Sequence, residues 1–372
     1  MSETEGAIFV AVTGDLVLDE PDAGYWLSGI APALREADIT IGHLEVPHTA
    51  SNVEVGGDVP APGAPPENLA ALPAAGFDVV TLAGNHIGDC GAEGIADTIG
   101  TLDSHGIRHS GAGSSLAAAR AAAVATAEGR RVAVLSYNCV GPEEGWAGPR
   151  KGGCAYLPIT TADGSPVSPT APLEGVSPVA ADILREDLRS AQDEADFVIV
   201  ALHKGIVHTP SKLAPYEREV AQLAVDCGAD AVISHHAHIV RGIEFHNGRP
   251  IFHGLGNGCV VTSALSPDQD HPARKEWAER RKKLFGFEPD PAYRLAPFHP
   301  EAVNAFIGRI EFRTGELPRI SIVPVFVEAP GRPVLADATQ GRAIYDYVER
   351  ITRDAGLPAI RIDADGRVEP LS

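Results

Sequence analysis

The sequence predicts an α/β protein in which the strands are covered by helices. Short apolar, β-rich runs alternate with segments of helical periodicity, and each run has about the length of a buried strand. Polar residues that could form a site follow several of these runs, where open α/β sheets usually place their sites. A chain of 372 residues can bury a substantial core. We predict one domain, residues 1–372.

The elements follow in chain order. The predicted strands are residues 8–13, 38–42, 77–83, 131–137, 197–202, 229–233 and 250–254. Apolar residues at helical spacing predict helices between them, at residues 26–37, 92–104, 114–125, 179–195 and 215–227. Residues 306–312 and 320–327 alternate as sheet strands do, and residues 338–353 predict a closing helix.

Three stretches do not fit this alternation. Residues 58–66 are Pro-rich, residues 141–178 are rich in Gly, Pro and Ser, and residues 262–300 contain a charged segment. Long insertions in a compact domain are more often lids or binding loops than accidents, and disorder is the alternative. We predict that the three insertions line a substrate cleft.

Charge and hydropathy exclude several classes of protein. The formal net charge of −20 argues against nucleic acid as a partner, because phosphate contacts need clustered Lys and Arg. No apolar run approaches the roughly 18 residues of a membrane-spanning helix, so no membrane partner is expected. The chain starts with acidic residues where a secretory signal would be basic, which predicts a cytoplasmic protein.

Candidate site residues follow the predicted strands. The series is Gly14-Asp15, Leu44-Glu45, Gly84-Asn85-His86 with Asp89 and Gly91, Leu202-His203-Lys204-Gly205, His236-Ala237-His238 and Gly254-Leu255-Gly256-Asn257. An Asn beside a His after a strand offers an oxygen and an imidazole to one cleft, and His-x-His in a tight loop can aim two nitrogens at it. A lone His is usually structural, but four together favour a metal site.

This series resembles that of the calcineurin-like metallophosphoesterase superfamily, in its branch of poly-γ-glutamate capsule (CapA-like) proteins, over about residues 7–330. The resemblance implies a four-layer αββα sandwich of two mixed sheets flanked by helices, with a metal site on loops at one end. In the superfamily's hydrolases the first motif is Asp-x-His, and both residues hold the first of two metals. Here Val17 stands in the place of that His.

The resemblance therefore implies one tightly held divalent metal. Its candidate ligands are Glu45, Asn85, His203 and His236, with His238 from the weakened first position. Glu45 stands where the dinuclear enzymes usually carry a bridging Asp, a departure that the CapA-like branch shares. Oxygen ligands suit Ca²⁺, Mg²⁺ or Mn²⁺, which we favour, whereas the imidazoles would also accept Zn²⁺ or Fe²⁺.

Loss of the first metal would free Asp15 to orient a histidine as an acid/base pair. His86 and Asp89 form the clearest such pair, and we predict His299 as the partner of Asp15. These four are the predicted catalytic residues. His253 and His43 are weaker candidates. We interpret the other histidines as structural or solvated: His48, His105, His109, His208, His246 and His271.

Two His/carboxylate pairs around one metal favour proton transfer on both faces of a carbon. The chain resembles the CapA-like enzymes of lasso-peptide biosynthesis that epimerise the C-terminal residue of a ribosomal precursor peptide. That resemblance implies a precursor peptide as substrate, and the acidic surface would suit a basic leader or core peptide. The strongest alternative is a metal-dependent hydrolase of a phosphoester or amide bond, with His86 as proton donor. A third is a non-catalytic CapA-like accessory protein that binds an anionic polymer or an assembly partner.

Overall fold

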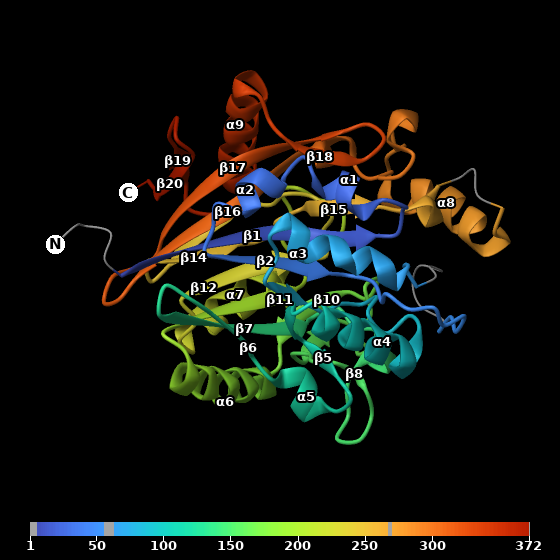
Figure 1. The fold of residues 1–372 in the computed structure, drawn as a ribbon, viewed down its shortest axis with the longest axis horizontal. Coiled ribbons are helices and arrows are strands. Elements are labelled where there is room, and N and C mark those ends of the chain that lie inside the picture. The colour runs from blue at the N-terminus through green and yellow to red at the C-terminus, as the bar shows by residue number, and fades with distance from the viewer. Residues whose placement is uncertain (1–5, 56–62, 267–269, 372) are drawn as a thin grey trace.

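The computed structural model describes residues 6–55, 63–266 and 270–371. Within these residues the chain forms two large mixed sheets that pack face to face, with helices on their outer faces (Figure 1). The predicted α/β class and the two-sheet sandwich flanked by helices are confirmed. Residues 58–62 of the first predicted insertion lie outside the described residues.

The first sheet has ten strands. Its path is β19 (Ile360–Ile362), β20 (Arg367–Pro370), β17 (Arg319–Glu328), β16 (Asn304–Arg313), β1 (Ala7–Leu18), β2 (Ile39–Leu44), β3 (Val79–Thr81) and β4 (Arg108–Ser110), with β15 (Asn257–Val261) beside β1 and β18 (Arg332–Leu335) beside β17. Strands β1 to β4 and β15 run parallel, and β16 is antiparallel to β1. The carboxyl ends of the parallel strands therefore meet at one edge.

The second sheet has six strands. Their order is β13 (Ile243–His246), β14 (Arg249–Phe252), β12 (Ala231–His235), β11 (Phe197–His203), β7 (Arg130–Asn138) and β6 (Ala123–Ala127). Strands β7, β11, β12 and β14 are parallel. Two small pairs lie outside the large sheets: β9 (Ile159–Thr161) with β10 (Leu173–Val176), and β5 (Ala112–Gly113) with β8 (Gly153–Cys154).

Apolar side chains alternate along the strands and fill three layers of core. One core lies between the sheets and includes Val10 of β1 and Ile199 of β11. The second packs the first sheet against α1 (Ala23–Leu27), α2 (Ala31–Leu34), α3 (Ala71–Ala75) and α4 (Gly91–Ser104). The third packs the second sheet against α5 (Leu116–Arg120), α6 (Pro178–Glu194) and α7 (Pro215–Asp226).

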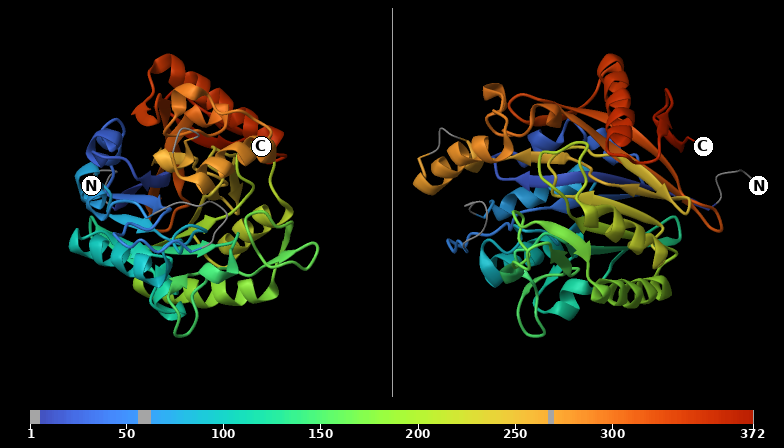
Figure 2. Two further views of the ribbon diagram at one scale, coloured as in Figure 1. Left: turned by 90° about the vertical axis from the view of Figure 1, so that its right-hand side faces the viewer. Right: turned by 180° about the vertical axis from the view of Figure 1, so that it is seen from behind.

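Two further helices lie at the margins. Helix α9 (Ala338–Asp354) packs on β17 and β19, and α8 (Pro272–Phe285) lies at the end of the molecule toward which β1 points (Figures 1 and 2). Short 3₁₀ helices complete the fold: η1 (Pro66–Ala70), η2 (Glu143–Gly145), η3 (Ser263–Leu265), η4 (Pro291–Tyr293) and η5 (Pro300–Val303). Among the described residues, no helix is both long and apolar enough to span a bilayer.

Two predicted helices are wrong in part. The helix predicted at residues 26–37 is divided into α1 and α2, because Gly29 and Pro32 interrupt the run. The one predicted at residues 114–125 ends with α5, and its residues 123–125 belong to strand β6, which pairs antiparallel with β7. An Ala-rich run favours helix by itself, but here pairing with the edge of β7 overrides that local preference.

Candidate metal and acid/base site

All predicted site residues except His299 gather where the parallel strands of both sheets end. Asp15 lies near the end of β1, Glu45 follows β2, and Asn85 and His86 follow β3. His203 ends β11, directly opposite His235 of β12. The backbone around Asp15 is irregular and closely packed. A β-bulge shifts the register of β1 at Asp15. A Cβ on Gly14 would lie 1.9 Å from the Gly256 carbonyl oxygen, so only glycine fits there.

His203, Asn85 and His236 form the centre of the cluster. Nε2 of His203 lies 2.7 Å from Oδ1 of Asn85 and 3.1 Å from Nδ1 of His236. All three residues are buried. Burial, together with the neighbouring His43 and His236, holds the pKa of His203 well below its usual value. Its imidazole is therefore neutral, which is the form that binds metal ions.

Asp15, Glu45 and His238 form an adjoining group. Nε2 of His238 lies 3.2 Å from Oε1 of Glu45, and its Nδ1 lies 3.5 Å from Oδ2 of Asp15 and 3.0 Å from Oδ1 of Asn257. Burial opposes charge on His238, but the two carboxylates raise its pKa to about 9. Burial and the charge of Glu45 raise the pKa of Asp15 well above its ordinary value.

The loop after β12 is strained where it presents its two histidines. His236 has φ 87° and His238 has φ 53°, both in the left-handed region that non-glycine residues rarely adopt. The conformation aims both rings from one short turn into the cluster. Such strain is typically retained where the surrounding structure fixes a functional side chain.

A stack of imidazole rings packs against the ring of His203. The ring of His43 lies 4.7 Å from that of His203 and 4.6 Å from that of His235. Nδ1 of His43 is 3.0 Å from the Thr81 hydroxyl. His43 was only a weak candidate from the sequence, and its position follows from register: it pairs with Asp15 across β1 and β2.

His86 and Asp89, which the sequence analysis predicts as an acid/base pair, are in direct contact. Nδ1 of His86 is 2.8 Å from Oδ2 of Asp89, and both side chains are almost fully buried. The pair lies in the loop between β3 and α4, next to Asn85. Asp89 fixes the orientation of the ring.

The pairing of Asp15 with His299 is corrected by the structure. Within the described part of the chain, the imidazole that forms an ion pair with Asp15 is His238. His299 lines a separate cavity of about 260 Å³, where its Nδ1 accepts a hydrogen bond from the Glu301 backbone N–H and its ring packs edge-on against Phe287. His299 is the N-cap residue of η5, and its hydrogen bond with the Glu301 backbone fixes the orientation of its ring.

The donor set fits a divalent cation. Two imidazole nitrogens and an amide oxygen already converge at His203, and the Glu45 carboxylate is buried beside them. Among the described residues, Oε2 of Glu45 has no hydrogen-bond donor. A buried carboxylate oxygen without a donor is costly unless a cation neutralises it. Mixed nitrogen and oxygen ligands suit Mn²⁺, Fe²⁺ or Zn²⁺, and the oxygens also suit Ca²⁺ and Mg²⁺.

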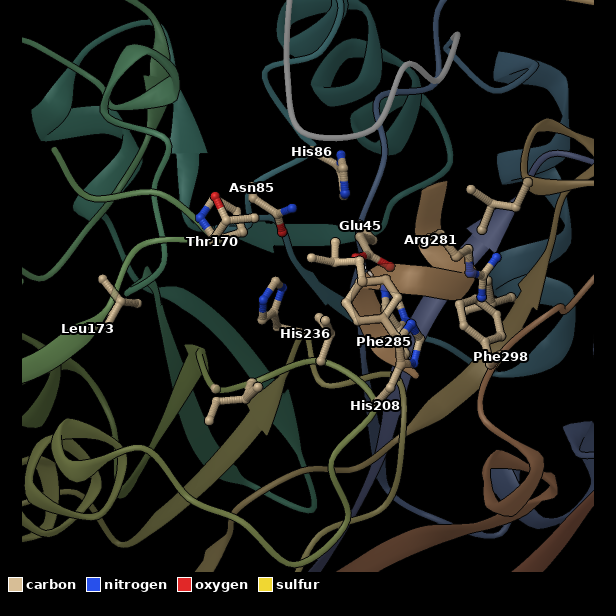
Figure 3. A pocket seen from close by; sticks show the side chains of 18 of the residues that line it. Glu45, Asn85, His86, Thr170, Leu173, His208, His236, Arg281, Phe285 and Phe298 are labelled. Atoms are coloured by element: carbon tan, nitrogen blue, oxygen red, sulfur yellow. Dashed lines mark ion pairs between the residues drawn. The ribbon is translucent and has the colours of Figure 1, made fainter. Parts of the chain in front are cut away.

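A cleft of about 660 Å³ opens over the cluster (Figure 3). Glu45, Asn85, His86, His236 and His238 form its polar floor. The walls are mainly apolar and come in part from two of the predicted insertions: residues 169–173 of the second, and residues 262, 264–265, 277, 280–281, 284–285 and 298 of the third. Val17 also lines the cleft, at the position where the Asp-x-His motif would carry its imidazole.

His208 was interpreted as structural or solvated, and of these two the structure supports the first. It is buried in the wall of the cleft, with its ring 4.6 Å from that of Phe285 and 6.1 Å from that of His238. Burial lowers its pKa well below the usual value, so the ring is a neutral wall residue. It lies beyond the His203-Lys204-Gly205 run and belongs to no motif that could have revealed it.

Known proteins with related sequences include one from Mycobacterium tuberculosis named "Probable polyglutamine synthesis accessory protein", which is 33% identical over 195 residues, 52% of this chain and 47% of that protein. This chain thus matches about half the length of that relative. An uncharacterised protein of Sinorhizobium fredii is 30% identical over 98% of this chain and 92% of its own. "Capsule biosynthesis protein CapA" of Bacillus anthracis is 27% identical over 63% of this chain and 53% of its own.

The solved structure of the calcineurin-like phosphoesterase YfkN from Bacillus subtilis is also similar, with a TM-score of 0.42 and 12% identity over 94% of this chain and 98% of that one. The family model described as "Bacterial capsule synthesis protein PGA_cap" matches residues 6–260. That match includes every predicted metal ligand. The chain belongs to the PGA_cap family of bacterial capsule synthesis proteins.

Proposed function

We propose that this protein is a metal-dependent peptide epimerase that inverts the Cα of the C-terminal residue of a ribosomal precursor peptide, as in lasso-peptide biosynthesis. One observation carries the proposal: two imidazole–carboxylate pairs, His86–Asp89 and His238–Asp15, adjoin the same cluster of donor atoms. Inversion requires a base on one face of the carbon and an acid on the other. Hydrolysis requires only one such group beside an activated water.

The residues of the two pairs have distinct tasks. His86, oriented by Asp89, removes or returns the Cα proton at its imidazole. His238, between Asp15 and Glu45, does the same from its own side. Glu45, Asn85, His203 and His236 would hold one divalent ion, which supplies Lewis-acid polarisation of the substrate's carbonyl or carboxylate. The apolar walls exclude water and hold the peptide end.

The test is incubation of the metal-loaded protein with candidate precursor peptides in deuterium oxide. We expect a one-unit mass gain at a single residue and appearance of its D form, without cleavage of the chain. Mass spectrometry and chiral amino-acid analysis measure the two effects. Cleavage of a peptide or of a generic phosphodiester, without deuterium at carbon, would contradict the proposal.

A metallohydrolase is the second candidate, and a specific observation favours it. Two groups that share Asp15 could each hold an ion: Asp15 with His43 and His203, and Asp15 with Glu45 and His238. The ligand atoms within each group all lie within 4.8 Å of one another. Two adjacent ions would form the centre of a dinuclear hydrolase.

The number of bound ions separates the two candidates. We expect one divalent ion per chain, because Val17 supplies no ligand to the first position, and we expect two in Val17→His, which restores an imidazole there. Elemental analysis after dialysis against excess Mn²⁺ measures the number. Val17→Phe, an aromatic substitution without a ligand atom, is the matched control and should still bind one. Two ions in the unaltered protein would favour the hydrolase.

A further inference from the structure

Helix α8 contributes an unusual cation to the cleft. Arg281 is only 3% exposed, yet it lines the cleft beside Phe298 (Figure 3). Its guanidinium carbon lies 5.3 Å from the ring centre of Trp277 and 5.7 Å from that of Phe298. Aromatic faces of this kind stabilise a cation, but they leave its hydrogen-bond donors unsatisfied.

Arg281 has few polar partners. One terminal nitrogen donates to the Pro297 carbonyl oxygen, and the buried Nε has no acceptor among the residues that the structure describes. In the described ranges of the chain, no carboxylate forms an ion pair with it. Burial alone sets its pKa, lowering it to about 10, so the side chain remains charged at neutral pH. A buried cation is costly unless an anion compensates it.

The surroundings define which anion would fit. Trp277, Leu284, Phe285 and Phe298 give this part of the cleft an apolar wall. Phe298 also stacks on His238, with 4.8 Å between ring centres, so one phenyl ring connects Arg281 to the acid/base cluster. A ligand that reaches both must therefore carry an anionic group next to an apolar one.

We propose that Arg281 is the anion-binding residue of the cleft and holds the free carboxylate of a peptide that ends in an apolar residue. The identity of the ligand as a peptide rests on the proposed function; the anion site itself rests on the surroundings of Arg281. The guanidinium fork matches a carboxylate in two parallel hydrogen bonds, which a lysine cannot supply. A phosphate beside an apolar group shares this chemistry.

Binding of simple probes to the full-length protein tests the proposal without any turnover. The probes are N-acetyl-L-leucine, its neutral amide N-acetyl-L-leucinamide, and phenyl phosphate. Calorimetric titration is made with the metal-loaded protein and again with chelator, which removes any contribution of a bound ion. We expect the acid to bind at least tenfold more tightly than the amide in both states, because charge-assisted hydrogen bonds are lost in the amide.

Three variants test whether Arg281 causes the preference for the acid over the amide. In Arg281→Gln, we expect acid and amide to bind equally. In Arg281→Lys, which keeps the charge, the preference should fall several-fold. Lys283→Gln, on an exposed position of the same helix, should keep the full preference. Circular dichroism checks folding, and if Arg281→Gln does not fold, Arg281→Lys decides.

Either of two results would overturn the proposal: no preference for the acid in the unaltered protein, or an undiminished preference in the Arg281 variants. Arg281-dependent binding of phenyl phosphate that is tighter than binding of the acid would also overturn the carboxylate assignment. The outcome is independent of the deuterium experiment. Absence of epimerisation leaves the binding result intact, and loss of the acid preference leaves exchange at Cα measurable.

Discussion

Glu217→Gln is expected to lower the free energy of unfolding by about 3–5 kcal/mol, because it breaks a buried ion pair on one side only. Oε2 of Glu217 lies 3.2 Å from Nζ of Lys204 and 2.6 Å from Nη1 of Arg241, and all three side chains are fully buried. Oε1 accepts a hydrogen bond from the Ala214 backbone N–H. Without the carboxylate charge, two buried cations face each other. Urea denaturation measures the loss.

The effect should depend on pH. Burial opposes charge on Glu217, but Arg241 and Lys204 lower its pKa below the ordinary value. Its contribution is therefore fully present above the pKa of the unfolded chain and is lost as the pH falls through the folded value. The difference between the unaltered protein and Glu217→Gln should accordingly shrink in acid.

Glu186→Gln is the matched control. Glu186 forms an ion pair with Arg120 at 2.7 Å, but its side chain is 67% exposed. Surface pairs contribute about 0–1 kcal/mol, so this variant should unfold almost as the unaltered protein does. An equally small loss in Glu217→Gln would show that the buried triad is held by packing rather than by charge.

The local periodicity of apolar residues was sufficient to predict most of the helices and strands. The helices α4, α6, α7 and α9 and the strands β1, β7, β11, β16 and β17 lie where periodicity predicts them. Residues 257–261 were not predicted as a strand, although they form β15 beside β1. Helix α8 was not predicted either, because its charged residues mask the apolar positions that face the cleft. Both depend on contacts with distant segments rather than on local preference.

The site residues also fall into two groups: those that sequence motifs predict and those whose positions depend on distant segments. The expected metal ligands stand in motifs at strand ends, and those motifs resemble the ligand series of a known family, so their convergence could be predicted. The stack of His43 on His203 and His235 depends on strand register, which the sequence of one strand does not specify. The partner of Asp15 is more than 200 residues away along the chain, in the strained loop that carries His238. Arg281 has no motif at all.

Replacement of the first acid/base pair should separate chemistry from metal binding. We expect His86→Ala to slow deuterium exchange at the substrate Cα by about 10²–10⁴-fold while one divalent ion stays bound. The contacts of 2.7 and 3.1 Å that bring the expected ligands together join His203 to Asn85 and to His236. Asp89→Asn should slow exchange by about 10–100-fold, because Asp89 acts only by orienting the ring. Equal loss of metal and exchange would show that His86 is a ligand.

A surface pair provides the control. His246 and Asp226 are 2.7 Å apart, much as His86 and Asp89 are, but they lie outside the cleft, so His246→Ala should change neither exchange nor metal content. The double variant His86→Ala/Asp89→Asn gives the sharper result. If Asp89 acts through His86, the double variant should be no slower than His86→Ala alone. Additive losses would mean that Asp89 contributes separately, and the pair would then not work as one acid/base unit.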